Sequence, residues 1–494
     1  MNKKVTEQPM ARILPDHEAA AQGTDPVLAP FRACRTKLTI LPAFRPCDED
    51  GAMAYNFLPA GRDQLYLMPP SVADWLEEGH LVFFLLDVVD ALELSEFYGH
   101  YRSDGVGRAA YDPSVMVAVL LYAYCVGERS SRGIERRCAE DVAFRVVSAN
   151  QVPDHATIAR FLKANEQALA SLFCQVLALC HAAGLVKVGT VALDGTKMGA
   201  NASNQANRTR DQVERALAEA IATDQEQDAR YGAARGDELP AELADPRSRR
   251  ARLAAAKADL DGREALRQAE HRRRLAAQAV RDGARTPRGG RRTLKPRRPK
   301  SEPRVNLTDP DSRAMRNWKG YLQGYNAQAV VTAEQVIVAT GVPQEPSDNH
   351  QVAPMVSAAL ASLVAAGVTE EIGAVVADAG YWSPQSVASS GGPELFIATR
   401  PNRVTAQAQL RRTGRIPASA TPLQLMERKL ATKRGRATYA QRGKTVEPVF
   451  GQIKEVRRAR RFQRRGLVAV GYEWRLLATT HNILKMWRMG AVIS

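Results

Sequence analysis

The chain has 494 residues and carries 69 Lys and Arg against 53 Asp and Glu, a formal net charge of +16. This length suffices for two or three domains with substantial cores, and the basic excess favours a nucleic-acid partner. The six cysteines include no CxxC pair, which argues against a disulfide framework or a zinc site.

Segments that direct a protein to a membrane are not evident. Residues 1–22 lack the apolar core that a signal peptide needs. The run Val115–Val126 is apolar or aromatic, but its twelve residues are too few to span a bilayer. We therefore expect a cytosolic protein without a membrane partner.

The first 185 residues divide by pattern. Residues 1–68 contain proline and charge without periodicity, which predicts a partly disordered leader. Residues 69–185 indicate a compact helical domain, with Asp112-Pro113 and Asp154 as helix starts. Such a domain either binds DNA or packs and dimerises, and the sequence leaves both alternatives open.

The segment Val188–Lys197 sets an aspartate at the end of an apolar, partly β-branched run. Val188, Val191 and Leu193 are typical of a buried strand, and Gly195 follows Asp194 directly. We expect Asp194 to stand where the sheet opens to solvent. Taken alone, an aspartate beside a glycine at a strand end is more often a turn residue.

Residues 205–303 are rich in Ala, Arg, Glu and Gln and poor in large apolar residues. Narrow apolar stripes predict two helices, marked by Val213, Leu217, Ile221, Leu253 and Leu260. The tract Arg281–Lys300 follows, with nine basic residues and one acid, and we expect it to be disordered. We interpret 205–303 as an inserted helical arm that either contacts DNA or a partner, or is a tolerated surface insertion.

The sheet pattern returns after the arm. Tyr321–Thr332 and Gln335–Gly341 predict a hairpin next to the Asp194 strand, and Val352–Val364 predicts an amphipathic helix. Ala374–Asp378 and Leu395–Thr399 predict two further strands. The fold class is therefore α/β, an RNase H-like mixed-sheet core formed by residues 186–204 and 304–494, with an N-terminal all-helical domain and a helical, basic insertion.

Two further acids occupy comparable positions. Asp378 ends an apolar run with Gly380 close behind, as Asp194 does. Glu447 leads into a helical pattern with Pro448 in its first turn, and Lys454 lies two turns further on the same face. Two strand-end aspartates and a helical glutamate can hold two Mg²⁺ or Mn²⁺ ions for phosphodiester chemistry. Alone, Glu447 is typical of a solvated carboxylate that favours the helix dipole.

The helix that carries Glu447 continues into a basic run. Lys454–Arg465 holds seven basic residues and one acid. Because this run lies directly beyond the proposed metal ligand, it favours contact with a phosphate backbone.

Several motifs together resemble those of bacterial insertion-sequence transposases of the DDE class, over most of residues 70–490. The matching segments are Asp194–Lys197, Asn306–Arg313, Gly324–Gln328, Ala377–Tyr381 and Val446–Lys454. The resemblance implies an RNase H-like core, two divalent metal ions per active site, and Asp194, Asp378 and Glu447 as the catalytic and metal-binding triad. It also implies a bacterial, nucleoid-associated location in the cytoplasm.

Related transposases carry a Tyr, Arg, Glu, Lys signature around the glutamate. This chain matches it with Tyr439, Arg442, Glu447 and Lys454, but it has four residues between Arg442 and Glu447 where the commonest form has three. We expect contacts to DNA from five side chains, those of Tyr439, Arg442, Lys454, Arg457 and Arg458.

The function implied is a transposase that binds the terminal inverted repeats of an insertion sequence, cleaves at the element ends and transfers the 3′ ends to target DNA. Its partners would be double-stranded DNA and a second copy of the chain in a paired-end complex. Two alternatives remain open: a metal-dependent DNA nuclease without strand transfer, and a catalytically inactive DNA-binding regulator.

Overall fold

The computed structural model describes residues 71–99, 101, 109–231, 249–283, 303–317, 320–388, 392–399, 414–417 and 419–493. The chain divides into two units, Met1–Leu67 and Met68–Ser494, and every described residue belongs to the second. The predicted leader and most of the basic tract Arg281–Lys300 lie outside the described residues.

Short helices form the first part of the described chain, as the sequence predicts. They begin where a polar side chain satisfies free backbone N–H groups: Asp112 accepts from Ser114 N at 2.8 Å, and Asp154 accepts from Ala156 N and Thr157 N at 3.0 Å. The helices are η1 (Val72–Trp75), α1 (Leu81–Asp90), α2 (Ser95–Tyr98), α3 (Pro113–Cys125), α4 (Ser131–Glu140), α5 (Val142–Val147), α6 (His155–Ala164) and α7 (Glu166–Ala182).

None of the helices among the described residues combines the length and the apolar character that a bilayer crossing requires. The apolar run Val115–Val126 forms α3 instead, and almost every side chain of α3 is buried in the protein core. Its hydrophobicity on all sides therefore reflects burial between other helices.

A mixed sheet follows, and its strand order is β4-β5-β1-β7-β8, with β6 pairing on β5. Its strands are β1 (Thr190–Gly199), β4 (Arg313–Asn317), β5 (Gly320–Thr332), β6 (Ile337–Gly341), β7 (Ala374–Ala377) and β8 (Glu394–Ile397). β5 is antiparallel to β1 and to β6, whereas β7 is parallel to both β1 and β8. The predicted hairpin and the mixed α/β class are confirmed, and the order matches the RNase H-like plan.

One detail of the predicted β1 is wrong. Asp194 lies inside the strand, because β1 continues to Gly199 and pairs with β5 from Val191↔Thr332 to Gly199↔Gly324. Only 14% of the Asp194 side chain is exposed. The glycine after it does not turn the chain, so Asp194 lies in a largely covered position on the sheet.

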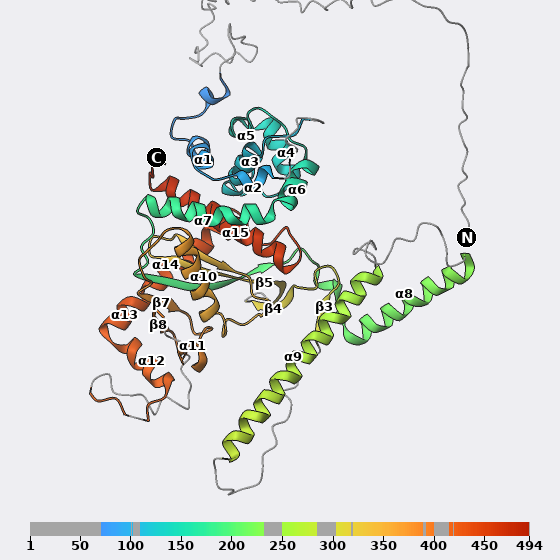
Figure 1. Cartoon of the computed structure of the whole chain (residues 1–494), viewed down its shortest axis with the longest axis vertical. Coiled ribbons are helices and arrows are strands. Elements are labelled where there is room, and N and C mark those ends of the chain that lie inside the picture. Colours follow the sequence, from blue (N-terminus) through green and yellow to red (C-terminus); the bar gives the residue numbers. More distant parts are fainter. Residues whose placement is uncertain are drawn as a thin grey trace, which may run out of the picture. The chain divides into compact units, whose positions relative to one another are not determined.

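Helices cover both faces of this sheet (Figure 1). α14 (Gln441–Gly451) and the π-helical turn η4 (Gln452–Val456) lie on the face that carries the side chain of Asp194. α10 (Val352–Ala365) lies on the other face, where its Met355 fills the space beside Gly341. The smaller helices α11 (Pro384–Ala388), α12 (Pro422–Ala431) and α13 (Lys433–Tyr439) lie near the β7 and β8 edge (Figure 1).

Pro448 does not stand in a first helical turn, as predicted, but inside α14, which begins at Gln441. A proline there leaves the carbonyl of Lys444 without its helical donor. The side-chain amide of Gln335 donates to that carbonyl at 3.1 Å. Gln335 in the β5–β6 turn therefore replaces the missing hydrogen-bond donor and anchors α14 to the sheet.

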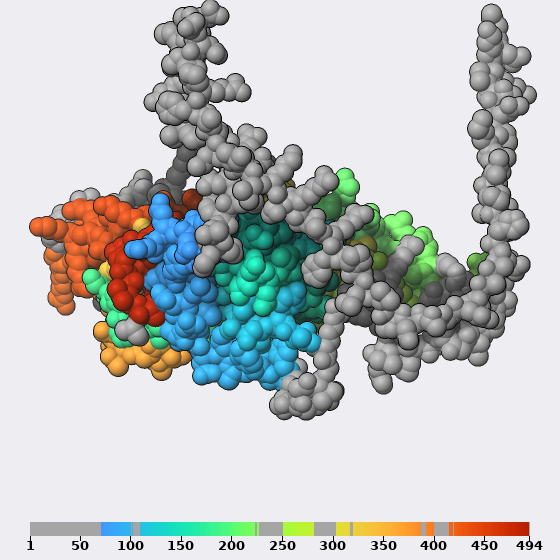
Figure 2. Space-filling model, turned by 90° about the horizontal axis from the view of Figure 1, so that it is seen from above, coloured from blue at the N-terminus to red at the C-terminus, as the bar shows by residue number. Residues whose placement is uncertain are grey.

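The last helix, α15 (Leu467–Arg488), connects the two parts of the described unit. It lies alongside α7 and also packs against α3 and β6 (Figure 1). Trp474 is fully buried and donates from Nε1 to the carbonyl oxygen of Gln328 in β5 at 2.8 Å. Figure 2 shows the blue segment that contains α1 next to red atoms of α15. Trp487 of α15 donates from Nε1 to the carbonyl oxygen of Gly79, just before α1, at 3.1 Å. One continuous core thus joins the N-terminal helices to the sheet.

The predicted arm contains α8 (Arg210–Tyr231) and α9 (Arg249–Gly283), between β2 (Asn207–Thr209) and β3 (Arg304–Asn306), which pair with each other. At its base the two helices share a small apolar cluster, formed by Val213, Leu253, Ala256, Leu260 and Val305. The distal half of α9 is largely exposed, including Leu266 and Val280.

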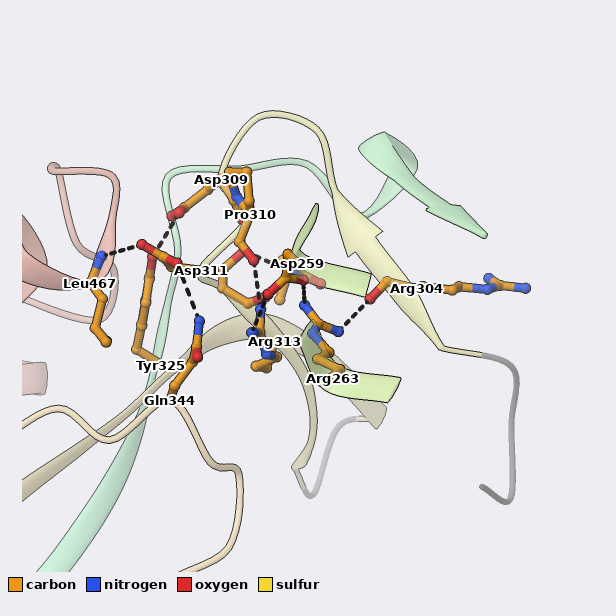
Figure 3. Close-up of polar contacts among 12 residues, drawn as sticks. Asp259, Arg263, Arg304, Asp309, Pro310, Asp311, Arg313, Tyr325, Gln344 and Leu467 are labelled. Carbon is orange, nitrogen blue, oxygen red and sulfur yellow. Dashed lines mark hydrogen bonds and ion pairs between the residues drawn. The ribbon is translucent and has the colours of Figure 1, made fainter. Parts of the chain in front are cut away.

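A polar junction attaches the arm to the sheet (Figure 3). Arg313, at the start of β4, binds Asp259 of α9 at 3.1 Å and the carbonyl oxygen of Ser312 at 3.0 Å. Two acids in the loop before β4 bind other elements. Asp309 accepts from the hydroxyl of Tyr325 in β5 at 2.7 Å, and Asp311 accepts from Leu467 N at the start of α15 at 2.8 Å.

We expect Arg313→Ala to loosen the base of the arm. The substitution leaves the partly buried carboxylate of Asp259 without its interdomain partner, at a cost of about 1–3 kcal/mol in local stability. Amide hydrogen exchange in residues 250–262 should quicken by roughly tenfold or more. Arg274→Ala is the control, because Arg274 pairs with Glu270 on the exposed part of α9. Equal exchange rates in the two variants would contradict the stabilising role of Arg313 at this junction.

Candidate active site

Two of the three predicted acids lie side by side on neighbouring parallel strands. Leu193 of β1 pairs with Ala377 of β7, and Asp194 and Asp378 are the next residues along each strand. Adjacent strands lie about 4.8 Å apart, so this register brings the two carboxylates together on one face. β7 ends at Ala377, and the carboxylate of Asp378 accepts from Gly380 N at 2.8 Å as the chain turns away.

The carboxyl group of Asp194 is in an unfavourable place for a negative charge. Burial raises its pKa to about 6, with Asp378 and Asp348 adding to the rise. The guanidinium of Arg442 and the N–H of Gly195, at 2.8 Å, act in the opposite direction. With a pKa of about 6 the group is still mostly charged at neutral pH, at a cost in free energy that a cation beside it, such as Arg442, offsets.

Glu447 reaches the same place from α14, with Arg442 between it and Asp194. Arg442 Nη2 donates to Asp194 Oδ2 at 2.7 Å, and Arg442 Nη1 lies 3.6 Å from Glu447 Oε1. The Arg442 side chain is 18% exposed and the Glu447 side chain 64% exposed. Among the residues that the structure describes, none forms a hydrogen bond with the buried Arg442 Nε. Asp194 and Glu447 therefore share one positively charged partner, the guanidinium of Arg442.

Lys454 and Tyr439 flank these acids. Lys454 Nζ donates to Thr196 Oγ1 at 2.8 Å and to the carbonyl of Lys197 at 3.2 Å, two and three residues beyond Asp194 on β1. Burial lowers the pKa of Lys454 and raises that of Tyr439, which also interacts with Arg442, Asp378 and Asp194. The π-helical turn η4 carries Lys454, and such turns are frequent at functional sites.

The structure contradicts the predicted DNA contact of Arg457. This side chain is 2% exposed, and its guanidinium donates to Thr480 Oγ1 at 2.8 Å and to the carbonyl oxygen of Leu477 at 3.1 Å. It fastens the end of η4 to α15. The backbone then adopts a left-handed conformation at Arg458, with a φ of 55°, which leaves the Arg458 side chain exposed.

Arg129, a basic residue of the N-terminal helical region, is also internal. Its guanidinium pairs with the buried carboxylate of Glu473 at 3.0 Å, and the Arg129 side chain is 7% exposed. An arginine in a sequence does not by itself reveal whether its side chain faces the interior.

The sequence reasoning missed Asp348. It lies between β6 and α10, and its Oδ1 accepts from Asn326 Nδ2 and Gln328 Nε2, both at 2.7 Å. The signal was available in the topology: β6 runs parallel to β1 and β7, so the loop that follows β6 opens at the same edge as the loop after β7. A single polar loop residue gives no such signal by itself.

The acids fit a hard divalent cation by their chemistry, because all of their donor atoms are carboxylate oxygens. Arg442 supports this, since a cationic group already lies between Asp194 and Glu447. Within the described ranges, however, no three His, Cys, Asp or Glu side chains are arranged to hold an ion together. Glu447 would have to exchange its contact with Arg442 for one with metal.

Comparison with known families gives two matches. The family model described as Transposase domain (DUF772) matches residues 70–164, and the one described as Transposase DDE domain matches residues 402–487. The second match contains Arg442, Glu447 and Lys454. Comparison with the curated proteins and with the solved structures gives no match.

We expect Asp194→Asn to stabilise the metal-free protein at pH 8, because asparagine mimics the neutral carboxyl group. The folded-state pKa of about 6 lies above the ordinary value of 3.8, so the wild type gains stability as the pH falls from 6 towards 4. The advantage of the variant should be on the order of 1–3 kcal/mol at pH 8 and should shrink near pH 4. Denaturant unfolding in EDTA at both pH values measures it. A variant less stable than wild type at pH 8 would refute the assigned electrostatic cost.

Proposed function

We propose that the chain is a DDE transposase of the insertion-sequence type, which binds the terminal inverted repeats of its element, cleaves the DNA at both ends and joins the 3′ ends to target DNA. Asp194, Asp378 and Glu447 are the proposed catalytic acids. Because two ends must be cut and joined together, two copies of the chain would act in a paired-end complex.

One observation carries the proposal: the β1–β7 register sets Asp194 and Asp378 side by side, and Arg442, which is 248 positions from Asp194 in the sequence, links Asp194 to Glu447. Gathering like charges in a largely covered place is unfavourable unless a cation is bound there. This cost supports a role in chemistry for the acids, since a purely structural sheet would gain stability from neutral side chains.

Asp194, Asp378 and Glu447 would hold two Mg²⁺ or Mn²⁺ ions. When bound, such ions activate the attacking oxygen and stabilise the charge on the departing one. The chain's own contribution is to hold the three carboxylates in place: Gly195 N and Gly380 N each donate to one of the aspartates at 2.8 Å. Both donors are backbone groups, so they persist when the carboxylates are mutated to amides.

DNA contacts are proposed for Tyr439, Arg442, Lys454 and Arg458. Lys454 lies beside Thr196 on β1, close enough to Asp194 to bind a phosphate next to the bond that is cut. Arg458 extends this basic surface, because its side chain is exposed at the end of η4. Arg442 would exchange its contact with Asp194 for one with the DNA backbone.

We expect Asp194→Asn, Asp378→Asn and Glu447→Gln each to reduce cleavage by at least roughly 100-fold, because each removes a negatively charged oxygen ligand. Binding to the repeats should stay close to wild type, since DNA affinity depends mainly on basic side chains. The substrate is a duplex with the inverted repeats found beside the gene, and cleavage and mobility shift are measured in Mg²⁺ and in EDTA. Cleavage that persists in EDTA, or in the Asp194→Asn variant, would refute the assignment.

The same preparation separates strand transfer from simple cleavage. A pre-cleaved end with a free 3′-hydroxyl is incubated with a supercoiled plasmid, and joined products are sequenced. Cleavage without any joining would favour a nuclease, and binding without either reaction would favour a regulator.

Arg442→Gln should change two affinities in opposite directions. Without the guanidinium, Asp194 and Glu447 are free for a divalent ion, so Mn²⁺ should bind more tightly in the absence of DNA. Affinity for DNA should fall, and its salt dependence should decrease by about one unit of slope. Arg442→Lys, which keeps the charge, is the control. Weaker Mn²⁺ binding in Arg442→Gln would show that Arg442 does not compete with metal.

A further inference from the structure

We propose that Asp348 is a fourth carboxylate of the active site, whose Oδ2 binds the divalent cation from the α10 side of the sheet while Asp194 and Glu447 bind from the α14 side. This inference rests on the proposed function, because it names a further ligand of the same site. It concerns a residue that neither the sequence motifs nor the two family matches assign.

Two side chains of β5, those of Asn326 and Gln328, hold Asp348 in position. Asn326 and Gln328 lie on β5 opposite Lys197 and Gly195, and their side chains are 2% and 0% exposed. They extend over Gly195, where a Cβ would lie 2.2 Å from Gln328 Nε2. Because Gly195 follows Asp194 directly, this is the sheet face behind the Asp194 carboxylate.

Two amides hold only one of the two oxygens of Asp348. Asn326 Nδ2 and Gln328 Nε2 both donate to Oδ1 at 2.7 Å, and within the described part of the chain Oδ2 accepts no hydrogen bond. Gln328 is itself fixed, because it accepts from the hydroxyl of Tyr381 and its backbone carbonyl accepts from Trp474. The carboxylate is therefore oriented by a rigid set of donors, with one oxygen left over.

That remaining oxygen lies beside Gly380, as does one oxygen of Asp378. A Cβ added at Gly380 would meet Asp378 Oδ1 at 2.9 Å and Asp348 Oδ2 at 3.2 Å. The two oxygens thus border one small space, which only the hydrogen of a glycine leaves open. Carboxylates arranged around such a space repel each other unless a cation lies between them.

The charge balance of the site supports a cation there. Burial raises the pKa of Tyr381, and the charges of Asp348, Asp194 and Asp378 add to the rise, so all three acids act on one buried hydroxyl. Arg442 contacts Asp194 and Glu447, and no ion pair within the described residues neutralises Asp348 or Asp378.

Asp348→Asn tests the free oxygen selectively. An asparagine keeps an Oδ1 that accepts from Asn326 and Gln328, but it replaces the Oδ2 lone pairs and charge with an amide N–H₂. Asp311→Asn is the matched control, because Asp311 is another loop aspartate that accepts from a glutamine amide and a backbone N–H, at the base of α15.

We expect Mn²⁺ affinity of the full-length protein without DNA, measured from the free-ion signal in electron paramagnetic resonance, to fall roughly tenfold or more in Asp348→Asn. Cleavage should fall as well and recover at higher Mn²⁺ concentration, which a merely structural loss would not allow. Asp311→Asn should bind Mn²⁺ as the wild type does. Equal Mn²⁺ affinity in both variants would overturn the proposal.

A second measurement uses the wild-type chain and does not depend on the folding of a variant. Fe²⁺ bound in place of Mn²⁺, with ascorbate and peroxide, cuts the backbone next to its ligands. Cuts are expected near Asp194, Asp378 and Asp348, and their absence near Asp348 alone would overturn the inference. If Asp194→Asn also kept full Mn²⁺ affinity and no cuts appeared near Asp194, the proposed function itself would fail.

Discussion

The arrangement of the whole site depends on the pairing of β1 with β7. Because Leu193 pairs with Ala377 in parallel register, the next residue on each strand is an aspartate, and the two carboxylates share one face of the sheet. A shift of one residue in this register would turn one of them to the opposite face. The register is in turn held by burial, since Val191 and Leu193 of β1 and their partners Val375 and Ala377 of β7 are fully buried. Hydrophobic packing thus brings together charges that would otherwise separate.

Placing these carboxylates together is electrostatically unfavourable, and the neighbouring groups reduce that cost. Burial raises the pKa of Asp194 to about 6, and the protein limits the rise with a guanidinium and a backbone N–H. Arg442 is well suited to the role because its planar fork can contact Asp194 and Glu447 together. A site balanced in this way is ready to exchange an internal cation for an external one. Preorganised carboxylates of this kind favour a hard divalent ion over protonation near neutral pH.

Residues far from the acids hold in place the helix and the side chains that position them. Pro448 breaks the hydrogen bonding of α14, and Gln335 from the β5–β6 turn repairs it, which fixes the helix that carries Glu447. Arg457 fastens η4 to α15, and Trp474 of α15 binds the carbonyl of Gln328, whose side chain orients Asp348. The N-terminal helices share the same core through α7 and α3. A substitution in the helical region can therefore alter the site without touching it.

The sequence by itself determined the mixed α/β class, the hairpin, the strand before Asp378 and the starts of several helices, because periodicity and capping are local properties. The family signature also pointed to Asp194, Asp378 and Glu447. It could not show that β1 continues through Asp194 to Gly199, since strand length depends on the partner β5. Nor could it separate exposed Arg458 from buried Arg457, or find Asp348, whose only local mark is a polar loop. Those outcomes were decided by the tertiary structure, because burial and the meeting of distant carboxylates depend on how strands pair and helices pack, which no local pattern encodes.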